Sequence, residues 1–238
     1  MTRRRWIADR VEGERAYLFA ANAAHLARVL RAKVGQQFDI AIGSAVRVGT
    51  IISIAPDQVE FALGPLVQSE ALPEVHVVLS IFKFDRLEWA IEKLTELGVA
   101  SMMPAVASRT EAHLAKAAGK RVERWRKLAH EAAQQARRPS APEISAPAPL
   151  KKAILEAKGH CVVLSEAEKT ATLKSILASY QAPLTLALGP EGGWTTEELH
   201  IFQERGWASA SLGTTILRAE TAAIAAVAIA MAELPKLP

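Results

Sequence analysis

Two segments near the C-terminal end of the sequence carry residues that could do chemistry. The first is Leu-Gly-Pro-Glu-Gly-Gly-Trp at 188–194, which directly follows the apolar run 184–188. Its three glycines let the backbone approach a ligand closely, and the missing side chains leave room for a flat group. The segment lacks the Gly-Lys-Ser/Thr of a phosphate loop and the Gly-x-Gly-x-x-Gly of a dinucleotide-binding loop. It is therefore either a glycine-rich turn or a binding loop of another kind.

The second segment is 212–221, where two charges stand in an apolar stretch. Arg218 and Glu220 are the only charged residues between Gly206 and Ala232. Charged groups in so apolar a setting need partners or a task. One alternative is that Arg218 and Glu220 form an ion pair with each other, and that Glu220 stands at the start of a helix, where a carboxylate is favoured. The other is that the two side chains act on a ligand.

Other reactive constellations are missing from the sequence. The six histidines show no metal-ligand spacing, and no Gly-x-Ser-x-Gly motif is present. Cys161 lies inside an apolar run, where a core position is more typical than a nucleophile. The sequence therefore predicts neither a metal site nor a hydrolytic triad.

The elements that must position the two segments alternate from residue 74 onward. Apolar runs predict strands, and helical periodicity with end signals predicts helices. The predicted strands are 75–81, 101–106, 161–164, 184–188 and 208–212. The first predicted helix begins at Asp85 and ends at Gly98, and the second spans 111–136 with Gly119 as a weak point. The third runs from the Thr195/Glu198 capping box to Arg205, and the fourth spans 220–234. This order predicts an α/β domain with a mainly parallel sheet, and ligands of such sheets gather at the carboxyl ends of the strands.

The first seventy residues have a different pattern. Asn22 is predicted to cap a helix, and the short β-type runs 38–42, 46–54 and 59–63 follow it. Closely spaced strands of this kind predict a small barrel, and 69–73 is predicted to be a linker. The expected domains are 1–72 and 73–238.

Composition limits the function classes. The chain has 238 residues, 50% hydrophobic and 23% charged, which are globular proportions. Its longest apolar run, 222–232, is too short for a membrane span of about 20 residues, and its basic N-terminus lacks the apolar stretch of a signal peptide. One cysteine excludes an internal disulfide. We therefore expect a cytoplasmic protein without a membrane partner.

Basic residues are concentrated in one window. The net charge is +4, but residues 109–138 hold nine basic and three acidic side chains, a local charge of +6. Such a window indicates either a polyanion partner, usually nucleic acid, or a solvated helix face.

Both C-terminal segments, in this order and at this spacing, resemble the RsmE family of SPOUT-class RNA methyltransferases. Gly189-Pro190-Glu191-Gly192-Gly193 with Thr196-Glu197-Glu198 resembles one family signature, and Leu212-Gly213 with 216–222 resembles the other. His25-Leu26, Lys83 with Asp85-Arg86, and Glu131-Ala132-Ala133 extend the resemblance over most of the chain. The sequence departs from the family at Thr215, where Arg is usual, and at Phe84 and Arg137, where Gly is usual.

This resemblance implies a fold and a function. It implies a SPOUT-type α/β domain with a deep trefoil knot, preceded by a PUA-like RNA-binding β-barrel, in a homodimer. The implied reaction is methylation of N3 of a uridine in 16S ribosomal RNA, with S-adenosyl-L-methionine as cofactor and an assembled small ribosomal subunit as the expected substrate. The target nucleotide rests on the resemblance alone.

The resemblance also assigns roles to residues. The expected cofactor-binding residues are Leu164, Leu188, Gly189, Glu191, Gly192, Gly193, Leu212, Gly213, Ile216, Leu217 and Thr221. In catalysis, Arg218 is expected to stabilise an oxyanion of the uracil, Glu220 to orient Arg218, and Glu191 to be an alternative base. The expected RNA-binding residues are Arg3, Arg4, Arg5, Arg28, Arg31, Arg121, Arg124, Arg126, Lys127, Arg137 and Arg138.

Two alternatives stay open. One is an RNA-binding protein of the same fold that has lost catalysis, with Thr215 as the sign of the loss. The other is an unrelated α/β enzyme that uses a nucleotide at the glycine-rich loop.

Overall fold

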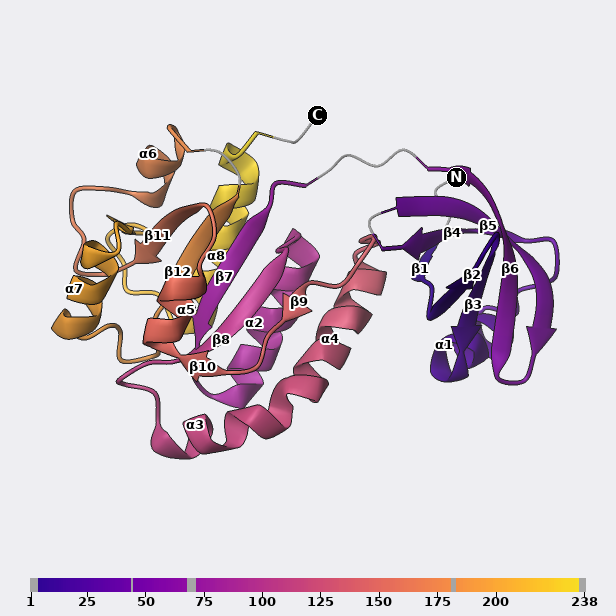
Figure 1. Cartoon of the computed structure of the whole chain (residues 1–238), viewed down its shortest axis with the longest axis horizontal. Helices are drawn as coiled ribbons and strands as arrows, with labels where there is room; N and C mark the ends of the chain where they lie inside the picture. Colours follow the sequence, from indigo (N-terminus) through magenta and orange to yellow (C-terminus); the bar gives the residue numbers. More distant parts are fainter. Residues whose placement is uncertain (1–3, 44, 68–71, 181–182, 236–238) are drawn as a thin grey trace. The chain divides into compact units, whose positions relative to one another are not determined.

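The computed structural model describes residues 4–43, 45–67, 72–180 and 183–235 (Figure 1). The chain forms two compact units, 1–69 with 133–140, and 70–132 with 141–238. This grouping differs from the expected continuous domains, because the short segment 133–140 belongs with the N-terminal unit. Most of the predicted linker lies outside the described residues.

The N-terminal unit is built on one sheet with the strand order β1-β4-β5-β6-β3-β2. Its strands are β1 (Arg5–Ile7), β2 (Arg10–Glu12), β3 (Arg15–Phe19), β4 (Gln37–Ile42), β5 (Ala45–Ala55) and β6 (Gln58–Leu66). β1 and β4 are parallel, and the other neighbours are antiparallel. The three predicted strands are confirmed as β4, β5 and β6. β1, β2 and β3 were not predicted: β1 and β2 have only three residues each, and β3, with three consecutive buried residues, does not alternate.

The predicted Asn22 helix cap is wrong. Helix α1 (Ala20–Ala24) begins after Phe19 and continues into a π-helical turn, His25–Val29. Asn22 lies inside the helix, and its amide donates to Asp9 Oδ1 at 3.4 Å. The other Asp9 oxygen accepts the backbone N–H of Phe19 at 2.7 Å, so a carboxylate from an earlier segment holds the helix start.

The C-terminal unit contains a fully parallel sheet, as predicted. Its strand order is β10-β8-β7-β12-β11-β13, and β9 also pairs with β8. The strands are β7 (Val75–Ser80), β8 (Ser101–Val106), β9 (Glu143–Ile144), β10 (Ala148–Pro149), β11 (His160–Leu164), β12 (Leu184–Leu188) and β13 (Ala208–Ala210). Every residue of β7 and β12 is buried, which explains why these strands are mostly apolar and do not alternate with polar residues on one face.

Helices cover both faces of this sheet (Figure 1). They are α2 (Phe84–Leu97), α3 (Ala112–Ala118), α4 (Val122–Gln135), α5 (Leu150–Glu156), α6 (Leu173–Leu177), α7 (Thr196–Glu204) and α8 (Ala219–Glu233). α2, α4, α6 and α8 share one hydrophobic core around Leu87, Trp125 and Ala223, and α5 and α7 share the other around Ile154 and Phe202.

Most predicted helix signals are confirmed, with one correction. Thr195 and Glu198 form the capping box of α7, and Gly98 ends α2 with φ 105°. The long helix breaks at Gly119 into a 3₁₀ turn between α3 and α4. Asp85 does not cap α2: the N-cap is Lys83, and Asp85 lies within the first turn. The short helices α5 and α6 were not predicted.

Candidate active site

A pocket of about 410 Å³ lies at the carboxyl ends of β11, β12 and β13. The segments that follow these three strands form its walls. Of the residues expected to bind a cofactor or catalyse, those that line it are Leu164, Leu188, Gly189, Glu191, Gly193, Leu212, Gly213, Ile216, Leu217 and Arg218. The two segments singled out by the sequence therefore meet in one cavity, which is large enough for a small organic ligand.

Several lining residues were not predicted. They are Arg86, Ser165, Glu166, Ala167, Lys169, Pro190, Trp194, Leu199, Ser211, Thr214, Thr215, Ala219 and Ala222. Ser165 to Ala167 directly follow the buried strand β11, so the rule that placed Leu164 at the pocket could have extended to them. Arg86 belongs to a segment that carries the family resemblance, but nothing in the sequence placed it at the pocket, and Lys169 carried no signal of either kind.

The glycine-rich loop is shaped by a tight turn and a buried tryptophan. Gly193 has φ +69°, and its N–H donates to the carbonyl of Pro190 at 2.8 Å. Gly189 packs on Trp194, since a Cβ at Gly189 would lie 3.3 Å from the indole. Trp194 Nε1 donates to the carbonyl of Leu164 at 2.9 Å, which ties the loop to the end of β11.

Two expected cofactor-binding residues do not line this pocket. The carbonyl of Gly192 accepts a hydrogen bond from Arg109, and a Cβ at Gly192 would lie 3.2 Å from Arg109 Cδ. Thr221 is exposed on the first turn of α8. Gly192 therefore fixes the loop through its contact with Arg109, and neither Gly192 nor Thr221 is part of the cavity wall.

Substitution of Gly193 is expected to abolish ligand binding in this pocket. Gly193→Val forces a branched side chain into a positive φ, with its Cβ near Glu166 Oε1, which lies 3.1 Å from the ideal position. Gly206→Val is a matched control, because Gly206 has a similar φ of +74° but no heavy atom within 4 Å of its Cβ position. Calorimetry with S-adenosylhomocysteine should show loss of affinity for the first variant alone. Equal affinities in both variants would place the ligand elsewhere.

Arg86 connects the two acidic residues of the site. Its Nη1 lies 2.9 Å from Glu191 Oε1, and its Nε lies 3.8 Å from Glu220 Oε1. Glu220 is only 5% exposed, and its Oε2 is buried without a hydrogen-bond partner among the described residues. Glu220 was expected to pair with Arg218 or to orient it; its ion pair is with Arg86 instead. A contact between residues so far apart in sequence could not be read from spacing.

Arg218 stands at the rim of the pocket. It is the N-cap residue of α8, its side chain is exposed, and no ion pair holds it within the described part of the chain. Its guanidinium is therefore available to a ligand.

Glu168 orders the segment between β11 and α6, which forms one wall. Its carboxylate accepts hydrogen bonds from Thr170 Oγ1 at 2.6 Å, Thr170 N at 2.7 Å and Ala171 N at 3.1 Å. These bonds lower the pKa of Glu168 from its usual 4.5 to about 2. Because the folded state lowers this pKa, the stabilisation is complete above about pH 4.5 and is lost as the pH falls through 2.

We expect an NMR titration of the Glu168 carboxyl carbon to show a midpoint near pH 2. In Glu168→Gln, the amides of Thr170 and Ala171 should exchange faster at neutral pH, because the amide oxygen accepts more weakly than a carboxylate. A midpoint near the ordinary 4.5 would mean that these bonds do not form in solution.

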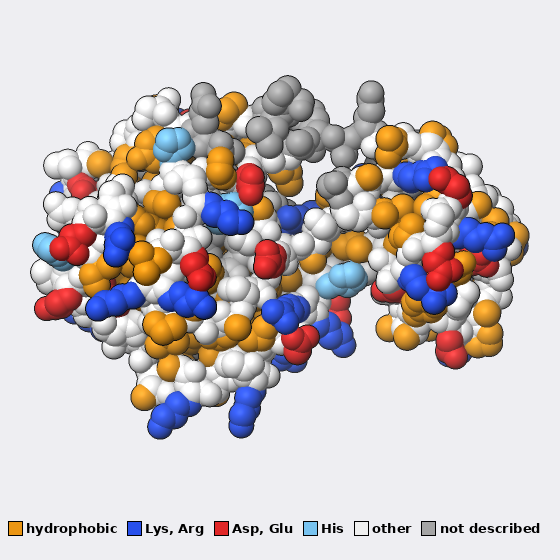
Figure 2. All heavy atoms as spheres, in the orientation of Figure 1, with side chains coloured by type: hydrophobic (Ala, Val, Ile, Leu, Met, Phe, Trp, Pro, Cys, Tyr) orange, Lys and Arg blue, Asp and Glu red, His pale blue; other side chains and the backbone are white. Residues whose placement is uncertain are grey.

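The basic side chains of 121–127 lie at the surface, but acidic neighbours neutralise part of their charge. Arg121 and Arg124 both reach Glu88, at 3.4 and 2.9 Å, and Arg121 also lies over the ring of Phe84. Arg126 pairs with Glu123, and Lys127 with Glu131. All four basic side chains remain exposed, and Figure 2 shows basic side chains projecting from the edge where Figure 1 places α3.

Two of the predicted RNA-binding arginines are structural. Arg5 is 14% exposed, pairs with Asp39 at 3.8 Å and donates to the carbonyl of Arg137. Arg138 is 9% exposed, and burial lowers the pKa of its guanidinium to about 10. Neither presents its charge to a phosphate. Arg4, Arg28, Arg31 and Arg137 are exposed, whereas Arg3 lies outside the described residues.

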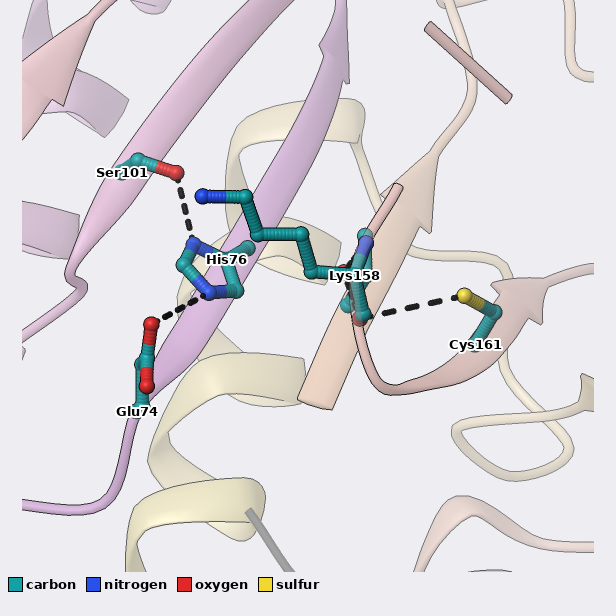
Figure 3. Close-up of polar contacts among 6 residues, drawn as sticks. Glu74, His76, Ser101, Lys158 and Cys161 are labelled. Carbon is teal, nitrogen blue, oxygen red and sulfur yellow. Dashed lines mark hydrogen bonds and ion pairs between the residues drawn. The ribbon is translucent and has the colours of Figure 1, made fainter. Parts of the chain in front are cut away.

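A second polar cluster lies at the amino ends of β7 and β8 (Figure 3). His76 Nδ1 lies 2.7 Å from Ser101 Oγ, and His76 Nε2 lies 3.1 Å from Glu74 Oε1. His76 and Ser101 are direct partners in the β7–β8 register, so their contact joins the amino ends of these two strands. Cys161, predicted to be a core residue, is half-buried, and burial raises the pKa of its thiol, which makes it a poor nucleophile.

Over the described ranges, no three His, Cys, Asp or Glu side chains come together as a metal site. Nor does any helix there have the length and apolarity needed to cross a membrane.

Comparison with known proteins identifies the family. Residues 69–231 match the family model described as an RNA methyltransferase domain. Ribosomal RNA small subunit methyltransferase E of Synechocystis is 31% identical over 219 residues, covering 89% of this chain and 71% of that protein. The protein of the same name from Mesomycoplasma hyopneumoniae is 32% identical over 156 residues, covering 66% of this chain and 68% of that protein.

Solved structures share the fold over nearly the whole chain. A Legionella pneumophila methyltransferase, solved with the bound cofactor SAM, aligns with a TM-score of 0.83 and 27% identity, covering 98% of each chain. Ribosomal RNA small subunit methyltransferase E from Neisseria gonorrhoeae, bound to S-adenosyl methionine, aligns with a TM-score of 0.83 and 23% identity, covering 96% of each chain. With its family signatures lining one pocket on a parallel sheet, this chain belongs to the ribosomal RNA small subunit methyltransferase E family of RNA methyltransferases.

Proposed function

We propose that this protein transfers a methyl group from S-adenosyl-L-methionine to N3 of a uridine in 16S ribosomal RNA of the small subunit. The observation that carries the proposal is the meeting of both signature loops in one pocket, with the unpaired Arg218 at its rim. The names of the relatives support the ribosomal RNA substrate. Because that substrate belongs to ribosomal subunits, we expect the protein to act in the cytoplasm.

The residues of the pocket fit the cofactor. Gly213 has φ +122° and no atom within 4 Å of its Cβ position, so the backbone there is open to a flat ligand. Leu188, Leu212 and Leu217 supply apolar surface, and the backbone around Gly189 and Gly213 supplies hydrogen-bonding groups that can read an adenine edge. When bound, S-adenosylmethionine supplies a methyl group already activated on a sulfonium.

The remaining task of the protein is to manage the uridine proton. N3 of uridine carries a hydrogen and is a poor nucleophile until that proton leaves. In our proposal, Arg218 stabilises the negative charge that develops on O4 or O2, and Glu191 is the candidate proton acceptor in the pocket. Since N3 lies on the Watson–Crick edge, the nucleotide must be unpaired or flipped out of its helix.

The exposed basic residues of 121–127 are proposed to hold RNA phosphates. Replacing Arg121, Arg124 and Lys127 by Ala is expected to flatten the dependence of log affinity on log salt. Each lost contact to single-stranded RNA changes the slope by about 0.7. The shared Glu88 makes the effect smaller than three full contacts, because it already neutralises part of this charge.

A control with the same charge change is available on other helices. Replacing the exposed Lys151, Lys152 and Lys174 by Ala should leave the slope unchanged. Equal slopes for both triple variants in RNA titrations from low to high salt would assign 121–127 to a solvated helix face.

We also propose the trefoil knot implied by the resemblance. The segment after β11 bonds to the segment after β13: Ser165 N donates to Ala210 O, and Ser211 N donates to Ala171 O, each at 2.9 Å. These bonds bring segments far apart in sequence side by side, which supports the proposed knot. The N-terminal sheet is proposed to be the PUA-like RNA-binding barrel.

A homodimer is proposed from the character of α8. This helix is apolar on all sides, yet only one side is buried in the chain, at Ala223, Ala226, Val227 and Ala230. Ile224, Ala225, Ala228 and Ile229 on the other sides are half-buried. Small residues permit close approach of a second helix, so we propose that this face is covered by a second copy.

One experiment tests the function directly. The protein is incubated with labelled S-adenosylmethionine and small subunits that lack the modification, and the labelled nucleoside is mapped. Labelled N3-methyluridine at one position of 16S RNA is the expected result. Binding of cofactor and subunits without transfer would favour a catalytically inactive RNA-binding protein, for which Thr215 at the pocket is the specific observation.

A further inference from the structure

A three-residue charge network at the pocket brings together parts of the chain far apart in sequence: Arg86 and Glu191 line the cavity, and Glu220 lies buried behind its wall. Arg86 lies in the first turn of α2, whereas Glu191 lies in the glycine-rich loop, 105 residues away, and Glu220 lies in the first turn of α8. One guanidinium thus reaches both signature segments, with Nη1 near Glu191 and Nε near Glu220.

Glu220 is the member of the network that most needs a cation. Its side chain is 7% exposed, whereas those of Arg86 and Glu191 are 32% and 33% exposed. A buried carboxylate without an opposite charge is strongly destabilising. Arg86 supplies that charge.

The other cations at the pocket are engaged elsewhere or face the cavity. Lys169 donates to the carbonyl of Glu166 at 2.6 Å, and Arg109 donates to the carbonyl of Gly192. Arg218 is two residues from Glu220, close enough in sequence to take the place of Arg86, but in the structure it forms no ion pair with any described residue. Glu220 thus has Arg86 as its cation, and Arg218 is left without an ion pair among the described residues.

We propose that Arg86 is a positioning residue for methyl transfer: it neutralises Glu220 and ties α8 to the glycine-rich loop, so that Arg218 faces the substrate instead of Glu220. This inference rests on the proposed function. Arg86 acts through Arg218: it contacts Glu191, the proposed proton acceptor, but in the proposal it does not touch the uracil or the methyl group. An arginine suits the position, because its planar guanidinium can donate to two carboxylates from different nitrogen atoms. The single ammonium nitrogen of a lysine is less suited to this geometry.

The test combines three substitutions in the full-length protein. Arg86→Gln is expected to lower kcat at least tenfold with little change in KM for the small subunit, because Arg218 turns to the uncompensated Glu220. Adding Glu220→Gln to Arg86→Gln should restore most of kcat, since no charge then attracts Arg218. In the Arg86→Gln background, Arg218→Ala should cost less than threefold in kcat.

The melting temperature of the free protein gives a readout that does not depend on activity. Arg86→Gln should lower it by about 5 °C or more, and Arg86→Gln/Glu220→Gln should recover most of that loss. Lys93→Gln is the matched control: Lys93 lies on the same helix, is as exposed as Arg86 and also bridges two carboxylates, Glu92 and Glu96, but neither of these is buried as Glu220 is. It should leave both kcat and melting temperature near wild type.

Each outcome decides one point. Wild-type kcat and melting temperature in Arg86→Gln, or a failure of Glu220→Gln to rescue it, would overturn the inference. If Arg86→Gln does not fold, Arg86→Lys replaces it, with a smaller loss of melting temperature but a clear loss of kcat expected. A wild-type protein that methylates nothing would refute the proposed function, and the melting temperatures would then still decide whether Arg86 neutralises Glu220.

Discussion

Arg218→Ala is expected to lower the rate of methyl transfer by about 10²–10³ while leaving the fold and cofactor affinity largely intact. Removal of one group that stabilises a developing oxyanion commonly has an effect of this size. The loss should appear in kcat more than in KM, because the uracil anion exists only as the N3 proton leaves. Arg218 is exposed and forms no ion pair in the described part of the chain, so its loss should change the free energy of unfolding by no more than about 0.5 kcal/mol.

Two comparisons make the Arg218 prediction specific. Arg218→Lys should recover little activity if a planar two-point contact to the uracil is required. Arg205→Ala removes an exposed arginine at the end of α7, outside the pocket lining, and should behave like wild type. Melting, calorimetry with S-adenosylhomocysteine and single-turnover methyl transfer are measured on the same preparations. Near-normal transfer by a folded Arg218→Ala protein would remove this residue from the catalytic site.

Trp194→Ala is expected to cause the largest loss of stability among the pocket substitutions, about 3–5 kcal/mol in the free energy of unfolding. Trp194 is buried, and its ring packs edge-on against Phe202 at 5.0 Å, which in turn packs against Trp207 at 4.9 Å. The substitution removes this packing and also the indole surface against which Gly189 packs. Cofactor affinity should therefore fall together with stability.

Trp194→Phe separates packing from hydrogen bonding. It keeps an aromatic ring beside Phe202 but leaves the carbonyl of Leu164 without its donor. We expect a loss of about 1–3 kcal/mol, since a buried acceptor then loses its partner. Urea unfolding gives both values. Equal losses for Ala and Phe would mean that the hydrogen bond, and not the ring, holds this loop.

The sequence predicted elements well where local signals agree with the fold. The buried parallel strands were visible as apolar runs, and the capping box at Thr195 marks the true start of α7. Cap predictions at Asn22 and Asp85 were wrong, because both side chains lie inside their helices, and Asn22 bonds to Asp9 from an earlier segment. A capping residue is predicted from its type and its position in the sequence. The free backbone N–H groups at a helix start can, however, also be bonded by a side chain from a distant segment.

The site was predictable as two loops but not as a charge arrangement. Apolar strands followed by glycines indicate the carboxyl edge of a parallel sheet, so the meeting of Gly189 and Gly213 in one pocket follows from topology. The pairing of Glu220 with Arg86 depends on how α2 packs beside α8, which no local pattern encodes. Likewise, nothing in the sequence distinguishes the buried Arg138 from the exposed arginines beside it.

The inclusion of 133–140 in the N-terminal unit has a consequence for how the chain is made. Synthesis runs from the N-terminus, so the first unit lacks a part until residue 140 has left the ribosome, by which time β7 and β8 of the second unit are already available to pair. The N-terminal unit is therefore complete only after the first two strands of the second unit have been made. For the same reason, a single cleavage near residue 72 would leave the N-terminal fragment without 133–140 and the C-terminal fragment with these residues in surplus.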